Sequence, residues 1–255
     1  MRKHPPTLCL VIPCYNEVKR LQPLKVRELQ KRLHCFIIFI DDGSNDDTVG
    51  LLSREFGQSQ NYMIMNSPKN EGKSRALYKG LIEAVTRGYE MIGYFDADSA
   101  VDVDDYKKAK ELLESNECID LVSGARVLLA GSRIARPNSR KWIGRIIATY
   151  ISLLIGQDYY DPQTPCKLFR RSYVSGLNKP STRWFLDAEI FLSRRARYDI
   201  SSRNVIHVVE FPLSTWNEVG GSSISSKQFF GVFKDLLVLT LRRFLFKNHP
   251  DTKTE

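Results

Sequence analysis

The stretch Met91-Ile92-Gly93-Tyr94-Phe95-Asp96-Ala97-Asp98 decides which fold class this chain is expected to adopt. It begins as an apolar run with aromatic residues, which is typical of a buried strand, and it stops at two carboxylates separated by one residue. In an open α/β sheet, ligands bind beyond the carboxyl ends of the strands, so we expect Asp96 and Asp98 to point into a cleft. Two residues apart on a strand, they would share a face and could hold a hard divalent cation, Mg²⁺ or Mn²⁺, together with a diphosphate. An isolated Asp-x-Asp is more often a solvated turn, so the choice between the two interpretations depends on the segments around it.

Two earlier strands also lead into polar loops. A strand over residues 8–12 is followed by Pro13-Cys14-Tyr15-Asn16-Glu17, in which the ring of Tyr15 is available to stack on a base. A strand over residues 35–40 is followed by Asp41-Asp42-Gly43-Ser44. A carboxylate at such a strand end can accept hydrogen bonds from a ribose or a base. A plain turn would explain the glycine but not the paired acids.

A third strand, over residues 62–66, precedes Asn70-Glu71-Gly72-Lys73, which opens a helix. Gly72 lets the backbone approach an anion, and Lys73 and the helix N-terminus supply positive potential. The spacing is not that of a P-loop. Strands and helices that alternate at short spacing predict an α/β fold with a parallel, doubly wound sheet.

The second half of the chain is strongly basic. The formal net charge is +9, which predicts attraction to polyanions or anionic membrane surfaces. No acidic residue occurs from residue 121 to residue 157, and an apolar series at helical spacing follows the basic residues of that segment. This pattern indicates an amphipathic helix on a membrane surface, or a core helix with a solvated basic end. A second amphipathic helix is expected over residues 229–245. The basic residues in question are Arg126, Arg133, Arg136, Arg140, Lys141 and Arg145.

The location of the protein is predicted from three observations. The five cysteines are odd in number and lack zinc-like spacing, which favours a reducing, cytosolic compartment. No signal peptide is evident, and no run of eighteen apolar residues occurs that would predict a membrane-spanning helix. We therefore expect a cytoplasmic protein that lies peripherally on the cytoplasmic face of an anionic membrane.

The four strand-end motifs, in this order and spacing, resemble those of the family 2 glycosyltransferases with the GT-A fold. The resemblance implies a mostly parallel twisted sheet flanked by helices, with C-terminal amphipathic helices, in one domain over residues 1–255. Within it, residues 7–123 would bind the nucleotide-sugar, residues 124–225 the acceptor, and residues 226–255 would form an amphipathic tail. A divalent cation would lie at Asp96 and Asp98. The nucleotide-sugar would contact Pro13, Tyr15, Glu17, Asp42, Asn70, Lys73, Asp96 and Ala97.

Later motifs narrow the resemblance to the polyprenyl-phosphate sugar synthases, in particular the dolichyl-phosphate glucosyltransferase branch. These motifs are Asp161-x-Gln163-x-x-x-Lys167-Leu168-Phe169, Arg183-Trp184-x-x-Asp187-x-Glu189 and Trp216-x-Glu218. The resemblance implies metal-dependent, inverting transfer of a hexosyl group from a UDP- or GDP-sugar to a polyprenyl phosphate. Ser223 stands where that branch usually has lysine, and the membrane spans of its relatives are missing. By the same resemblance, Asp98, Asp161 and Gln163 would be catalytic, and Arg126, Arg140, Trp184, Asp187, Glu189 and Trp216 would contact the sugar or the acceptor.

Two other functions fit part of the sequence. A family 2 transferase with a soluble saccharide acceptor would explain the missing spans but not the later motifs. A nucleic-acid-binding module would use the basic segment from Arg126 to Arg145 as a phosphate stripe. The acidic strand ends would repel a polyanion, so we expect no nucleic acid partner. Filter binding to DNA or RNA at two salt concentrations separates these classes.

Overall fold

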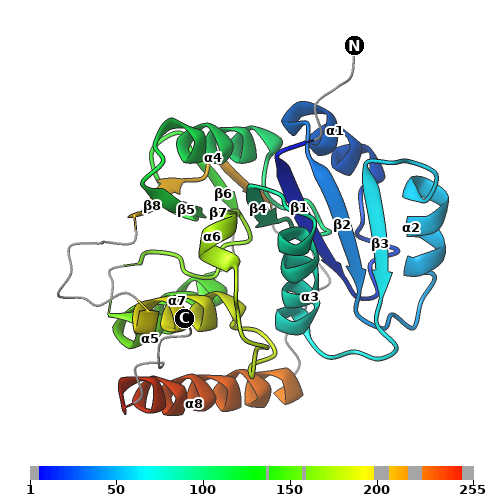
Figure 1. Cartoon of the computed structure of the whole chain (residues 1–255). Helices are drawn as coiled ribbons and strands as arrows, with labels where there is room; N and C mark the ends of the chain where they lie inside the picture. The colour runs from blue at the N-terminus through cyan, green and yellow to red at the C-terminus, as the bar shows by residue number, and fades with distance from the viewer. Residues whose placement is uncertain (1–5, 136–137, 157–158, 198–206, 218–225, 249–255) are drawn as a thin grey trace.

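The computed structural model describes residues 6–135, 138–156, 159–197, 207–217 and 226–248 (Figure 1). Seven strands form one sheet in the order β3-β2-β1-β4-β7-β5-β8. The first four of these run parallel, as expected, and β8 runs parallel to β5. The prediction of a mostly parallel α/β sheet flanked by helices is therefore confirmed. The strands are β1 (Leu8–Cys14), β2 (Phe36–Asp41), β3 (Tyr62–Asn66), β4 (Met91–Tyr94), β5 (Ile119–Ala125), β7 (Lys167–Arg170) and β8 (His207–Pro212).

One strand, β7, runs antiparallel to both of its neighbours, β4 and β5. The chain reaches β7 through a loop that passes the carboxyl end of β4, so the residues just before β7 lie near the acids that follow β4. A separate two-stranded sheet pairs β6 (Arg133–Ala135) with β9 (Thr215–Asn217). These additions lie in the half of the chain that was expected to bind the acceptor.

Both faces of the large sheet are covered, because its strands are apolar on both sides. Leu8, Leu10 and Ile12 of β1 face one core, which also contains side chains of α1, α2 and α4. Cys9 and Val11 face the other core, which contains side chains of α3, α5, α6, α7 and α8. The helices are α1 (Pro23–Leu33), α2 (Thr48–Phe56), α3 (Lys73–Thr86), α4 (Val103–Ser115), α5 (Asn138–Ile155), α6 (Arg171–Val174), α7 (Leu186–Arg197) and α8 (Ser226–Asn248).

Helix α5 has one buried apolar face and one exposed apolar face. Its inner face, with Ile151 and Ile155, is buried in the core. Its outer face exposes Trp142, Ile146 and Leu153, each with more than two thirds of its surface open. Helix α8 lies beside α5 at the lower edge of the molecule in Figure 1 and is joined to it by a hydrogen bond between Tyr150 and Thr240. Among the described residues, no helix is long and apolar enough to cross a membrane.

Candidate active site

The loops that follow β1 and β2 are joined to each other by hydrogen bonds. The N–H of Asn16 donates to Ser44 Oγ at 2.9 Å, and the N–H of Asn45 donates to Asn16 Oδ1 at 2.8 Å. Asn16 has a φ of 56°, a conformation that asparagine adopts more readily than most residues. The loops hold Tyr15 at the surface, where 41% of it is exposed. An exposed ring at this sheet edge is available for the predicted stacking on a base.

Three of the residues expected to contact the nucleotide-sugar have other partners in the structure. Pro13 lies within β1 opposite Ile40, and Ala97 is buried in the core. Glu17 is 6% exposed, and its carboxylate accepts a hydrogen bond from Arg20 Nε at 2.9 Å. These three residues therefore shape the edge of the sheet. Any contact of theirs with a ligand stays a prediction.

Asp42 links the loop after β2 to the loop before α3. Its two carboxylate oxygens accept the N–H groups of Glu71 and Gly72, at 3.0 Å and 2.7 Å, and the residue is 3% exposed. Gly72 has a φ of +100°, which glycine adopts without strain. Because both oxygens hold the backbone, we expect Asp42 to act on the nucleotide chiefly by fixing residues 70–73.

Replacing Asp42 with alanine is expected to weaken nucleotide binding by about 1–3 kcal/mol, since two buried N–H groups lose their acceptor. Isothermal calorimetry with UDP and GDP measures this effect. Ser53→Ala on the exposed side of α2 removes a hydrogen bond away from these loops and serves as the control. Unchanged nucleotide affinity in Asp42→Ala would remove this residue from the donor site.

The two acids after β4 lie on a turn and not on the strand itself. Strand β4 ends at Tyr94, and the N–H of Ser99 donates to the carbonyl of Asp96 at 3.0 Å. Lys73 Nζ contacts Asp96 Oδ1 at 2.6 Å. Burial, together with the charge of Asp96, raises the pKa of Asp98 to about 6. The expectation that Asp96 and Asp98 share one strand face is wrong, because Phe95 is the last residue bonded to β1 and a turn over residues 96–99 follows.

The acid pair can contribute to a cation site but does not complete one. Among the described residues, no three His, Cys, Asp or Glu side chains lie together in an arrangement that could hold a metal ion. Burial is the largest cause of the raised pKa of Asp98 and the charge of Asp96 adds to it, whereas the charges of Lys73 and Arg20 lower that pKa. Carboxylate oxygens suit Mg²⁺ or Mn²⁺, which usually keep water and phosphate oxygens as further ligands. The residues present therefore fit a divalent cation that a diphosphate shares.

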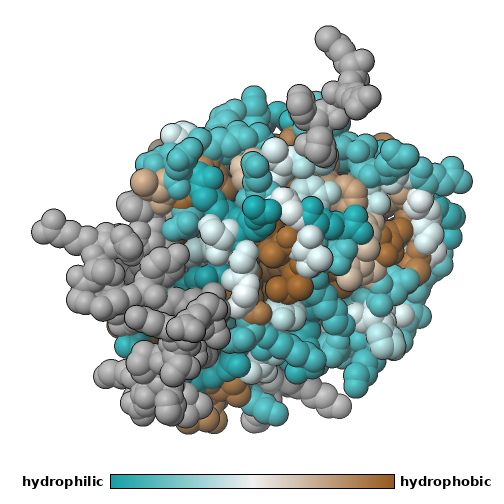
Figure 2. Space-filling model, viewed as in Figure 1, coloured by the Kyte–Doolittle hydropathy of each residue, from teal (hydrophilic) through white to brown (hydrophobic). Residues whose placement is uncertain are grey.

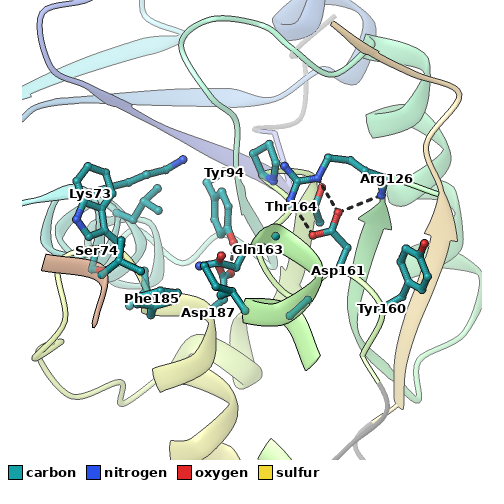
Figure 3. A pocket seen from close by; sticks show the side chains of 18 of the residues that line it. Lys73, Ser74, Tyr94, Arg126, Tyr160, Asp161, Gln163, Thr164, Phe185 and Asp187 are labelled. Atoms are coloured by element: carbon teal, nitrogen blue, oxygen red, sulfur yellow. Dashed lines mark hydrogen bonds and ion pairs between the residues drawn. The ribbon is translucent and has the colours of Figure 1, made fainter. Parts of the chain in front are cut away.

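A pocket of about 350 Å³ extends from Lys73 and the start of α3 to the loop before β7 (Figure 3). One of its walls comes from α5 and α8, through Gly144, Ile147, Ala148 and Val232. The loop over residues 160–165 also lines the pocket. The pocket brings together these predicted site residues: Lys73, Arg126, Asp161, Gln163, Trp184 and Asp187.

The end of the pocket away from Lys73 contains an ion pair between Arg126 and Asp161. Arg126 Nε and Nη2 donate to the two oxygens of Asp161 at 2.6 Å and 2.7 Å, and the N–H of Arg126 donates to the same carboxylate. Burial raises the pKa of Asp161, but the charge and hydrogen bonds of Arg126 outweigh burial, so this pKa lies below its usual value. The guanidinium carbon of Arg126 lies 4.7 Å from the centroid of the Trp216 ring. Asp161 thus orients Arg126 and is not placed to accept a proton.

Arg145 lines the pocket, although it was not among the site residues predicted from the sequence. Its guanidinium lies 4.0 Å over the ring of Tyr160 and donates to the Tyr160 carbonyl at 2.8 Å. Two pocket arginines, Arg126 and Arg145, are thereby fixed on the loop that carries Asp161. The side chain of Arg140, also predicted for this role, lies outside the described residues, as does Ser223.

Asp187 is held in the pocket wall by two neighbours. The hydroxyl of Tyr94 donates to Asp187 Oδ1, and Lys167 Nζ lies 3.4 Å from the same oxygen. Lys167 is fully buried and donates to the carbonyl of Thr164 at 2.6 Å. Figure 3 shows Gln163 near Asp187 on this wall. Lys167 was not predicted as a site residue, although its motif is part of the resemblance.

Glu189 is not among the residues that line the pocket, in contrast to the expectation for it. Its carboxylate accepts the N–H groups of Ser181 and Thr182 and pairs with Arg242 of α8. It is a buried anchor for the loop before α7, because an ionised group can be buried only when it is paired and hydrogen-bonded. Trp184, at the end of that loop, does line the pocket and is 37% exposed.

Comparison with known proteins agrees with this geometry. Residues 9–177 match the sequence model of glycosyl transferase family 2. A dolichyl-phosphate beta-glucosyltransferase of Trichomonas vaginalis is 29% identical over 246 residues, which cover 91% of this chain and 70% of the relative. A UDP-N-acetylglucosamine–dolichyl-phosphate N-acetylglucosaminyltransferase of Methanococcus voltae is 26% identical over 259 residues, covering 92% and 97%.

Among solved structures, glucosyl-3-phosphoglycerate synthase from Mycobacterium tuberculosis, in complex with Mn²⁺ and UDP-glucose, superposes with a TM-score of 0.68. The alignment covers 92% of this chain and 78% of that one, at 14% identity. At this identity the likeness shows a shared fold.

Proposed function

Because this chain belongs to glycosyl transferase family 2 and is a glycosyltransferase, we propose that it transfers a hexosyl group from a UDP- or GDP-sugar to a polyprenyl phosphate. The observation that carries the proposal is the pocket itself. Lys73, beside the two acids, lies at one end of it, and Arg126 and Arg145 lie at the other. Apolar side chains of α5 and α8 form one wall of the pocket. The named relatives that act on dolichyl phosphate support the same acceptor.

On the donor side, the diphosphate would lie between the N-terminus of α3 and the acid pair. Lys73 would donate to its oxygens, and the first N–H groups of α3 add positive potential. A divalent cation held by Asp96 and Asp98 would neutralise charge that develops on the leaving diphosphate. Gln163 and the second oxygen of Asp187 would bind sugar hydroxyls from the facing wall.

On the acceptor side, Arg126 and Arg145 would bind the phosphate of the lipid. A phosphate monoester is anionic at neutral pH, so direct displacement with inversion requires no strong general base. This agrees with the pairing of Asp161 to Arg126, which keeps Asp161 from serving as one. The apolar wall from α5 and α8 would contact the first part of the polyprenyl chain.

A donor screen tests the proposal. The protein is incubated with each of a set of UDP- and GDP-sugars, a divalent cation and polyprenyl phosphate, and release of the nucleoside diphosphate is measured. We expect release from one donor to depend on the lipid. Release that instead depends on an added soluble saccharide would favour the alternative acceptor class.

We also propose that the protein lies on the cytoplasmic face of an anionic membrane. The outer faces of α5 and α8 expose apolar side chains at helical spacing (Trp142, Ile146, Leu153, Phe233, Leu237 and Leu241). In Figure 2, apolar residues are visible at the lower edge of the molecule, where Figure 1 places α8. Five free cysteines support a reducing compartment.

The protein is accordingly expected to pellet with anionic liposomes at low salt and to be partly released at high salt. Each basic residue near the membrane surface contributes about 1 kcal/mol of binding free energy, which salt weakens. Apolar side chains buried in the membrane contribute binding free energy that salt does not weaken. Replacing Arg136, Arg140 and Lys141 with glutamate should reduce pelleting and lipid glycosylation but not hydrolysis of the donor. Replacing Phe233 and Leu237 with serine should have the same effects.

Leu24→Ser is the matched control for these variants, because Leu24 is 79% exposed but lies on α1, which covers the other face of the sheet. It should pellet like the wild type. A wild-type protein that stays free of anionic vesicles at every salt concentration would contradict the membrane proposal and favour a soluble acceptor.

A further inference from the structure

Helix α8 buries one acidic side chain on the face opposite its exposed apolar residues. Phe233 and Leu237 are exposed, whereas Asp235 is 6% exposed and Leu239 is fully buried. A buried carboxylate is costly unless hydrogen bonds compensate for the lost water. Asp235 Oδ2 accepts the N–H of Arg183 at 2.7 Å and the N–H of Trp184 at 3.1 Å. The carboxylate therefore binds the backbone of the loop before α7.

A second buried acid attaches the same loop to the same helix. Glu189 accepts the N–H groups of Ser181 and Thr182, at 3.0 Å and 2.7 Å, and pairs with Arg242, which lies about two turns from Asp235 on the same face of α8. All four residues of the 181–184 loop thus have their N–H groups bound by a carboxylate. In Figure 1 this yellow loop reaches α8 near the N-terminal part of the helix.

The other side of the 181–184 loop contacts the donor end of the pocket. The carbonyl of Arg183 accepts the N–H of Ser74 at 2.9 Å, and the Arg183 guanidinium donates to Asn70 Oδ1. A Cβ on Gly72 would lie 3.0 Å from Cβ of Arg183, so the two segments are in close contact. The N–H of Gly72 is in turn bound by Asp42. A continuous series of contacts therefore runs from α8 to the end of β2.

From these contacts we infer that Asp235 is a positioning residue for donor binding. It fixes the 181–184 loop, which places Trp184 in the pocket wall and supports the backbone on either side of Lys73. Asp235 is not among the residues that line the pocket, so it acts through the loop. The inference rests on the proposed donor site and adds that an α8 side chain sets its affinity.

The test is calorimetric titration of the full chain with UDP and with GDP, each in the presence of Mn²⁺. Asp235→Ala is expected to weaken nucleotide binding about tenfold, the effect of losing one well-made buried contact. In Asp235→Asn the amide oxygen can still accept both N–H groups, so binding should stay within about threefold of the wild type. In turnover, the KM for the donor should rise more than kcat falls.

Asp105→Ala provides the matched control. Asp105 is also a buried carboxylate that accepts loop hydrogen bonds, from the N–H of Ser214 at 3.1 Å, but it holds the segment before β9. We expect this variant to lower the melting temperature and to leave nucleotide affinity unchanged. Asp235→Ala with wild-type nucleotide affinity would overturn the inference.

Hydrogen exchange at the Ser74 amide gives a readout that needs no nucleotide. Its N–H should exchange faster in Asp235→Ala than in either the wild type or Asp105→Ala, because its acceptor belongs to the released loop. Unchanged protection of Ser74 would also overturn the inference. A wild type that binds neither UDP nor GDP would refute the proposed donor site, whereas the exchange measurement would still decide whether Asp235 holds the loop.

Discussion

Replacing Asp98 with alanine is expected to abolish sugar transfer and to leave the protein folded. The raised pKa of Asp98, about 6, means that the folded state destabilises the ionised carboxylate relative to the unfolded chain, so at neutral pH this charge costs stability. Removing this carboxylate should therefore not lower the free energy of unfolding. It does remove one of the two acids proposed to hold the cation, and we expect the rate of transfer to fall by more than about a hundredfold.

The measurement is transfer rate and melting temperature for wild type and variant, with Mg²⁺ or Mn²⁺ and with excess chelator. Asp104→Ala is the control, because this exposed acid lies on α4 and pairs with Arg32 of α1. The control should retain transfer. Full activity in Asp98→Ala, or full wild-type activity in chelator, would contradict the role of the acid pair.

Loss of Arg126 is expected to have the second large effect, on both stability and acceptor use. Arg126→Ala leaves Asp161 buried without its partner, which should lower the free energy of unfolding by about 3–5 kcal/mol. It also removes the guanidinium proposed to bind the acceptor phosphate. We therefore expect lipid glycosylation to be lost, while nucleotide binding at the other end of the pocket is retained.

Two further variants separate the structural effect from the functional one. Arg126→Met combined with Asp161→Leu removes both buried charges, so it should recover stability relative to Arg126→Ala but remain inactive on lipid. Arg126→Lys keeps a charge but loses the paired geometry, and the KM for polyprenyl phosphate should rise. If Arg126→Lys has wild-type kcat/KM for the lipid, the acceptor phosphate does not depend on this guanidinium.

The fold could be predicted because its signals are local. Four strands end in polar loops, and the carboxyl ends of parallel strands meet at one sheet edge, so Tyr15, Asp42, Lys73 and Asp96 could be grouped from sequence alone. The antiparallel direction of β7 could not be predicted from the sequence, since it depends on which sheet edge is open when the chain returns. Consequently Lys167, which β7 brings beside Asp187, was missed.

The roles of single carboxylates were harder to predict, because a carboxylate in a site and one that binds backbone N–H groups look alike in a sequence. Glu189 was expected to contact sugar or acceptor, but it binds the 181–182 backbone. Asp161 was expected to be catalytic, but it binds Arg126. Asp235 offered one usable signal: it is an acid on the apolar side of an amphipathic helix. Such a residue is buried only where it has N–H or cationic partners.

The most direct test of the central claim follows a labelled sugar from donor to lipid. The protein is incubated with a radiolabelled nucleotide-sugar, a divalent cation, polyprenyl phosphate and a soluble oligosaccharide in one reaction, and the mixture is extracted with organic solvent. We expect label to enter the organic phase only when polyprenyl phosphate is present, and Arg126→Lys to reduce this transfer. Label that remains in the aqueous phase with every donor, or that enters the oligosaccharide, would contradict the central claim.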